Sequence, residues 1–234
     1  MVAVLFLTGF IAFAIAQEQS PTPAMSPRDV HDVVLPITLL AQLEKAKDIR
    51  ETLALSPDVS AVAYDTIRTS TDNADWMDNH PHVAVFRAGR LAADLDVTEF
   101  AIHLSGPIRF TDMNIVRSRS DNPILIAAFA LAVDGSGTFF VFIGQQGNSY
   151  KVLATLHGAQ AQLRFNHSAP DRVELWTADK SVGHSFEDSC VWCPKYYRKK
   201  VYAWRNGRLK LVSNSLDEEA HSPGDFDEHR FIIQ

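Results

Sequence analysis

The chain contains two cysteines, Cys190 and Cys193, which form a CxxC pair in the segment SCVWCPKYYRKK, residues 189–200. This spacing is compatible with a thiol–disulfide exchange centre, with half of a metal site or with a small structural disulfide. An exchange centre needs a helix N-terminus, whose dipole lowers the pKa of the attacking thiol. Pro194 and a strand-like run follow the pair instead. The basic side chains beyond it would favour a thiolate, so a redox-active pair remains an alternative.

A zinc site at this pair would need further ligands to reach four. His184, His221 and His229 are available, but the sequence has no second CxxC and no histidine pair at ligand spacing. Haem attachment requires a histidine directly after the second cysteine, and a proline occupies that position. Because cysteines in an exported chain usually oxidise in pairs, we predict a local disulfide between Cys190 and Cys193. The sequence predicts no cofactor.

A second group of metal-ligating side chains lies in TDNADWMDNHPH, residues 71–82. Asp75, Asp78, His80 and His82 offer the mixed oxygen and nitrogen ligands that a divalent cation accepts. No recognised ligand spacing is met, so the favoured interpretation is a polar loop that leads into the strand HVAVF. The four side chains are retained as a weak candidate metal site.

A run of basic residues without an intervening acid follows the cysteines. Its members are Lys195, Arg198, Lys199, Lys200, Arg205, Arg208 and Lys210. One interpretation is a basic hairpin that docks an anionic glycan, a lipid head group or an acidic protein. The favoured interpretation is a solvated strand pair that the acidic tail at residues 217–234 partly neutralises.

The sequence lacks the GxSxG, HExxH, P-loop, GxGxxG and SxxK signatures of common enzyme classes. Nine histidines and 28 carboxylates still allow a dispersed hydrolase site that linear spacing would not reveal. A net charge of −6 gives no reason to expect a nucleic-acid partner. Asn166-His167-Ser168 matches the N-glycosylation triplet, which matters only in a eukaryotic secretory route.

The first residues indicate where these groups would operate. Residues 2–16, VAVLFLTGFIAFAIA, carry no charge and end in a small-x-small site before Gln17. The stretch predicts a signal peptide over residues 1–16, cleaved to leave no membrane span, because a span needs roughly 20 apolar residues. Residues 17–32 are rich in proline and serine and predict a flexible lead-in. We therefore expect an exported protein, periplasmic or secreted.

The remaining chain predicts one β-rich domain over residues 33–216 with an N-terminal helix. Leu39, Leu40, Leu43 and Leu53 recur at helical spacing, so residues 33–55 are expected to form an amphipathic helix that lies on a sheet. Short apolar runs with turn signals follow from residue 59, which predicts an antiparallel sheet, sandwich or blade-like array. ILIAAFALAV and TFFVFIG are expected to form a central hairpin that is buried on both faces.

Two stretches of the chain echo each other. VAVFRAGRL at residues 83–91 and VYAWRNGRL at residues 201–209 share five of nine positions. Asn206-Gly207 is a strong signal for a type I′ turn, in which both central residues have positive φ, and Gly89 serves the same purpose after Ala88. The echo predicts two similar hairpins.

The segment from about residue 123 to 213 resembles a C-terminal β-module of exported bacterial proteins, itself distantly similar to the blades of FG-GAP/VCBS propellers. The matching positions are Leu175, Trp176, Tyr197, Tyr202, Trp204 and Gly207. The resemblance implies a blade-like antiparallel unit. Calcium binding is not implied, because the Asp134-Gly-Ser-Gly loop supplies one carboxylate where a calcium loop needs several oxygens.

Three functions follow from these patterns. The favoured one is a non-catalytic binding or structural role at the cell envelope or outside the cell, with an anionic envelope component or another protein as partner. The alternatives are a thiol–disulfide protein that uses Cys190 and Cys193, and a hydrolase with a dispersed site.

Overall fold

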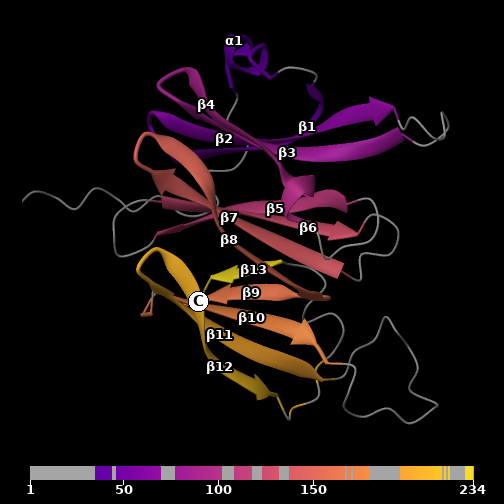
Figure 1. The fold of residues 1–234 in the computed structure, drawn as a ribbon, viewed down its shortest axis with the longest axis vertical. Coiled ribbons are helices and arrows are strands. Elements are labelled where there is room, and N and C mark those ends of the chain that lie inside the picture. The colour runs from indigo at the N-terminus through magenta and orange to yellow at the C-terminus, as the bar shows by residue number, and fades with distance from the viewer. Residues whose placement is uncertain are drawn as a thin grey trace, which may run out of the picture.

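A computed structural model describes residues 35–43, 46–69, 77–101, 108–117, 123–131, 137–166, 168–169, 171–179, 196–217, 219, 221 and 230–233. The protein is mainly β, and its strands form three sheets that stack along the long axis of the molecule (Figure 1). This confirms the predicted fold class. The predicted signal peptide and lead-in lie outside the described residues, as do Cys190, Cys193, His184, Lys195 and Asp75.

The N-terminal and middle sheets are each built from four consecutive strands that pair antiparallel. The N-terminal sheet contains β1 (Ala46–Ser56), β2 (Val59–Thr69), β3 (Met77–Arg87) and β4 (Arg90–Asp96) in that order. A 3-10 helix, η2 (Val97–Phe100), leads to the middle sheet of β5 (Ile108–Arg117), β6 (Pro123–Leu131), β7 (Gly137–Gln146) and β8 (Ser149–Ala159).

The C-terminal sheet has one strand more than the others. It contains β9 (Gln162–Phe165), β10 (Arg172–Ala178), β11 (Tyr197–Arg205), β12 (Arg208–Leu216) and β13 (Phe231–Ile233), in the order β12-β11-β10-β9-β13. β13 is parallel to β9, whereas the other pairs are antiparallel. The end of the predicted acidic tail is therefore part of the sheet.

The middle sheet is buried on both faces, as predicted for the β6–β7 hairpin. In β6, Leu125 and Ala127 pack into the core shared with the N-terminal sheet, and the alternate residues Ile126 and Ala128 pack into the core shared with the C-terminal sheet. Because side chains alternate along a strand, a continuous apolar run supplies both cores.

The predicted helix over residues 33–55 is wrong over most of its length. Among the described residues of this range only α1 (Ile37–Leu40) is helical, and residues 46–55 belong to β1 instead. β1 pairs with β2 across a tight turn, which places Leu53 in a core and brings the Arg50 side chain to 2.6 Å from the buried Asp65 carboxylate. These tertiary contacts outweigh the helical spacing of the leucines, since propensity is a weak prior.

The two echoing segments form equivalent hairpins. Each joins the third and fourth strand of its sheet, with positive φ at Ala88 and Gly89 (49° and 75°) and at Asn206 and Gly207 (54° and 73°). The middle sheet also joins its third and fourth strands, β7 and β8, by a two-residue turn, but there only the first central residue, Gly147, has positive φ (61°). In all three sheets the register leaves one extra residue on the fourth strand shortly after the turn, at Ala92, Leu153 and Val212. The molecule therefore repeats one four-stranded unit three times.

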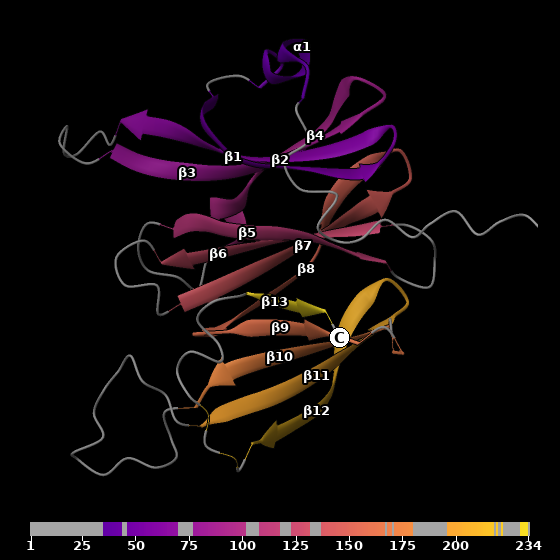
Figure 2. The same cartoon turned by 180° about the vertical axis from the view of Figure 1, so that it is seen from behind.

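The outer face of each terminal sheet is covered by a segment from its own end of the chain. Leu35 and Leu43, on either side of α1, pack on Tyr64 and Phe86 of the N-terminal sheet. At the other end, His221, which follows β12 in the chain, contacts Trp176 of the C-terminal sheet, and β13 lies at the edge opposite β12 (Figure 2). Within the described residues, no helix is long and apolar enough to cross a membrane.

Candidate functional site

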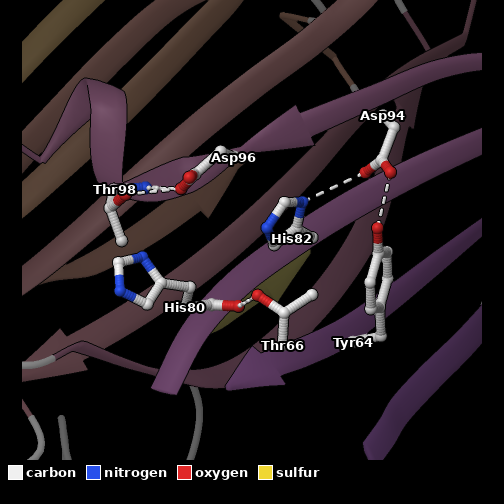
Figure 3. Close-up of polar contacts among 7 residues, drawn as sticks. All are labelled: Tyr64, Thr66, His80, His82, Asp94, Asp96 and Thr98. Carbon is white, nitrogen blue, oxygen red and sulfur yellow. Dashed lines mark hydrogen bonds and ion pairs between the residues drawn. The ribbon is translucent and has the colours of Figure 1, made fainter. Parts of the chain in front are cut away.

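A polar cluster lies on the outer face of the N-terminal sheet, where three neighbouring strands place their side chains on one side. Tyr64 of β2 is paired with His82 of β3, and Asp94 lies on β4 (Figure 3). The Tyr64 hydroxyl donates to Asp94 Oδ2 at 2.6 Å, and His82 Nδ1 lies 3.2 Å from Asp94 Oδ1. The Tyr64 and His82 rings stack with centroids 5.1 Å apart.

These contacts fix the proton positions in the cluster. A carboxylate can only accept, so both the Tyr64 hydroxyl and His82 Nδ1–H donate to Asp94. Burial by itself opposes ionisation of Asp94, but the hydrogen bonds from His82 and Tyr64 outweigh it and lower the pKa of this carboxyl. Burial, followed by the Asp94 hydrogen bond, raises the pKa of Tyr64 far above its ordinary value. Tyr64 therefore stays a neutral donor and Asp94 a charged acceptor.

Two more polar groups extend the cluster along the strands. His80 lies two residues before His82, and its carbonyl accepts a 3.4 Å hydrogen bond from the Thr66 hydroxyl. Asp96 caps η2 by accepting hydrogen bonds from the Thr98 backbone and hydroxyl. The Asp96 carboxylate therefore stabilises the start of η2, although its side chain lies close to those of the histidines (Figure 3).

The candidate metal ligands are only partly placed by the structure. His80, His82 and the backbone of Asp78 lie on β3, whereas Asp75 lies outside the described residues. His82 is already hydrogen bonded to Asp94. Among the residues that the structure describes, no three His, Cys, Asp or Glu side chains are grouped so that they could hold a metal ion.

A second cluster surrounds Trp176 on the outer face of the C-terminal sheet. The Arg164 guanidinium lies 4.3 Å from the centroid of the Trp176 ring, and Lys199 Nζ lies 5.4 Å from it. Glu174 links the cluster, because it accepts from the indole N–H at 3.2 Å and pairs with Lys199 at 2.7 Å. The tryptophan is thereby held between two cations, which its π face attracts.

The chain beyond β12 closes over this ring. His221 makes edge contacts with Trp176 and Tyr197, at centroid distances of 5.8 Å and 5.6 Å. His221 Nε2 donates to Asp217 at 3.0 Å, and Asp217 also accepts from the Glu219 backbone. The His221 hydrogen bond, followed by the backbone one, lowers the pKa of Asp217.

The basic run does not behave as one surface. Arg198 pairs with Asp179 at 2.7 Å and Lys199 pairs with Glu174, so the neutralising acids belong to β10 and the residue after it. Neither of these ion pairs involves the acidic tail, most of which lies outside the described residues, so its part in neutralising the basic run stays a prediction. Lys200, Arg205, Arg208 and Lys210 form no ion pair with any described residue, and the last three of these side chains are exposed.

Sequence reasoning found His82 and the basic residues but missed their partners. Asp94, Asp179 and Glu174 carry no motif, and they meet their partners only through strand register. The one available signal in the sequence was the alternation of polar and apolar side chains along a strand. His80 and His82 alternate with Pro81 and Val83 in β3, which indicates a polar strip on one face of that strand.

The arrangement of both clusters is that of hydrogen-bonded supports. Each His–Asp pair has an aromatic ring as its neighbour. A His–Asp pair in such a setting can orient a ring and fix a proton. No protein-family model matches the chain, and no curated protein matches it either.

Proposed function

We propose that this is an exported, non-catalytic protein with a binding or structural role at the cell envelope or outside the cell. The observation that carries the proposal is the use made of both His–Asp pairs. His82–Asp94 fixes Tyr64 beside the N-terminal cover, and Asp217–His221 is itself the cover over Trp176. The two His–Asp pairs, which could in principle transfer protons, thus serve to hold the sheets and the segments that cover them.

The non-catalytic role is tested with chromogenic ester, phosphate, peptide and glycoside substrates. We expect no hydrolysis above that of the heat-denatured protein. Hydrolysis of any substrate that persists through purification and disappears in His82→Ala or His221→Ala, with the fold retained by circular dichroism, would contradict the proposal. Tyr202→Phe provides the control, because this half-buried phenol packs against the core between the middle and C-terminal sheets and, among the described residues, makes no hydrogen bond to either pair.

Export is supported by the uncharged apolar run at residues 2–16 and the Ala14-x-Ala16 site. We expect the exported chain to begin at Gln17. Expression in a host with a general secretory pathway, followed by N-terminal sequencing of the extracytoplasmic fraction, measures this directly. Recovery of a chain that retains Met1, or one that needs detergent for extraction, would refute it.

The disulfide Cys190–Cys193 is proposed together with export, since the two cysteines would then meet in an oxidising compartment. Closing so small a loop stabilises by about 2 kcal/mol at most on the chain-entropy estimate. Cys190→Ser/Cys193→Ser should therefore keep the fold and lose no more than that in urea denaturation. Turnover of a dithiol substrate that vanishes in this variant would instead support the thiol–disulfide alternative.

The blade-like nature of the sheets is also a proposal. It is supported by the three consecutive four-stranded meanders, by their face-to-face stacking, and by the extra residue that each fourth strand carries after its hairpin turn. In such an array each unit contacts only its neighbours, so stability depends on the interfaces between units.

A further inference from the structure

β12 forms an open edge of the C-terminal sheet. Among the described residues, its only neighbour in the sheet is β11, and the residues from Arg208 to Leu216 are nearly all exposed. Leu211 and Val212, at the centre of the strand, are 53% and 45% exposed. An edge strand of this length with an apolar centre is a template for pairing with another strand.

The hydrogen bonds around β12 show which of its backbone groups point away from the sheet. Arg205 and Arg208 close the two-residue turn and face each other, and at the far end the Asp217 N–H donates to the Tyr197 carbonyl at 2.8 Å. Antiparallel pairs alternate between bonded and non-bonded residues, and the extra residue at Val212 shifts this alternation. The outward N–H and C=O groups therefore belong to Leu209, Leu211, Asn214 and Leu216.

The equivalent edge of the N-terminal sheet is closed by the chain itself. Leu91 occupies in β4 the place of Leu209 in β12, and its N–H donates to the Gln42 side chain at 3.1 Å. Gln42 also donates to the Gly89 carbonyl at 3.2 Å. Among the described residues, no side chain caps Leu209 in this way.

Charge along β12 changes sign from one end to the other. Arg205, Arg208 and Lys210 lie at the turn, whereas Asp217 and Glu219 follow the opposite end, where the lowered pKa keeps Asp217 ionised. An antiparallel copy of the same strand would therefore place basic residues against acidic ones at both ends.

The register of two antiparallel β12 strands follows from the backbone N–H and C=O groups that point away from β11. A two-fold axis between Val212 and Ser213 matches Leu209 with Leu216 of the second copy and Leu211 with Asn214 of the second copy. The same axis places Arg208 opposite Asp217 of the second copy. All four outward residues then face outward residues, and the exposed Leu211 and Val212 lie opposite Asn214 and Ser213 of the second copy.

We propose that the occupant of the β12 edge is a second copy of this chain, paired antiparallel through β12. The interface is isologous, as in most closed dimers, and it joins the two C-terminal sheets into one continuous sheet. This pairing goes beyond the proposed function, because it depends on the strand edge alone and would hold for a catalytic protein as well.

The backbone part is tested by sedimentation equilibrium of the purified chain under reducing conditions, which prevent cross-linking through the cysteines. We expect a dimer for the wild type. Leu211→Pro removes an outward N–H without removing a bond to β11 and should yield a monomer, whereas Leu211→Ser keeps that N–H and should still dimerise. A wild-type monomer throughout the accessible concentration range would overturn the proposal, as would a Leu211→Pro variant that dimerises like the wild type.

The charge part uses two matched variants. Arg208→Glu should weaken dimerisation about tenfold or more, because symmetry removes two ion pairs and introduces two repulsions. Arg90→Glu makes the same change at the equivalent position of β4 and should leave the dissociation constant unchanged. Added salt should weaken the wild-type dimer more than the Arg208→Glu dimer. Equal effects of the two variants would show that the contact lies elsewhere on the molecule, and would refute the β12 pairing even if Leu211→Pro does not fold.

Discussion

The outer faces of the N-terminal and C-terminal sheets are both covered by the nearest end of the chain, and both carry a His–Asp pair beside an aromatic ring. At the N-terminal sheet the pair belongs to the strands, since His82 lies on β3 and Asp94 on β4. At the C-terminal sheet both members, Asp217 and His221, belong to the covering segment. The N-terminal cover is held mainly by leucines, whereas the C-terminal cover is held by ring contacts and by β13.

Because the two His–Asp pairs are attached to different parts of the chain, loss of a covering segment should affect them differently. Loss of the N-terminal cover would leave Tyr64, His82 and Asp94 still joined by strand pairing. Loss of the C-terminal cover would carry His221 and Asp217 away from Trp176 together. We therefore expect the two covers to differ in how strongly a single substitution affects them.

The largest effect is expected at Leu43, which is 5% exposed under the N-terminal cover. Leu43→Asp places an unpaired charge against Phe86 and its neighbours, which costs several kcal/mol. We expect the variant to melt far below the wild type or not to fold, as measured by circular dichroism. Ile37→Asp in the same segment is the control, because Ile37 is 83% exposed and should tolerate the charge. An unchanged melting temperature for Leu43→Asp would show that this cover is dispensable.

Phe231 anchors the C-terminal cover and should have the next largest effect. Its ring makes an edge contact with Phe140 of the middle sheet at 5.9 Å. Phe231→Ala should lower the free energy of unfolding by about 3 kcal/mol, since it leaves a cavity between the two sheets. Urea denaturation measures the loss. Proteolysis should then cut the chain after β12 first, and a uniform loss of protection over all three sheets would contradict separate covers.

Tyr64→Phe tests how the N-terminal His–Asp pair contributes to stability as the pH changes. The variant removes one donor to Asp94 and should cost about 1–2 kcal/mol near neutral pH. The folded pKa of Asp94 lies below its unfolded value of about 3.9, so this stabilisation is present above about pH 4 and is lost as pH falls through the folded pKa. Tyr64 has a raised pKa, so its contribution is lost as pH rises above about 10.

Wild type and Tyr64→Phe should therefore differ most between these limits and converge in acid. Urea denaturation across pH, together with carboxyl NMR titration of Asp94, measures both effects. An unchanged Asp94 pKa in the variant would show that the Tyr64 hydrogen bond does not stabilise the carboxylate.

The smallest effect is expected for His221→Ala, because Asp217 keeps its hydrogen bond from the Glu219 backbone. We expect a loss of about 1 kcal/mol and a rise in the pKa of Asp217 toward its ordinary value. Glu219→Gln is the matched control, since the backbone N–H of Glu219 and not its side chain contacts Asp217. A loss as large as that of Phe231→Ala would mean that His221 holds the whole cover.

Local patterns predicted much of the fold. Apolar runs located β3, β6 and β7, and Asn206-Gly207 located a turn, because these features depend on neighbouring residues alone. β1 was misassigned because its leucines fit the helical period as well as the strand, and only pairing with β2 decides between them. Asp94 could not be predicted as a partner of His82, since the register of β3 and β4 creates that contact.

The burial of the middle sheet on both faces has a consequence for the chain before it folds. β6 and β7 carry apolar side chains on both sides, so no solvated face protects them until the two neighbouring sheets have formed. Such segments associate with copies of themselves when they are exposed. The middle sheet is thus the aggregation-prone part of the nascent chain. A holding chaperone that engages residues 123–146 during synthesis would raise the yield of native protein more than one that engages either end.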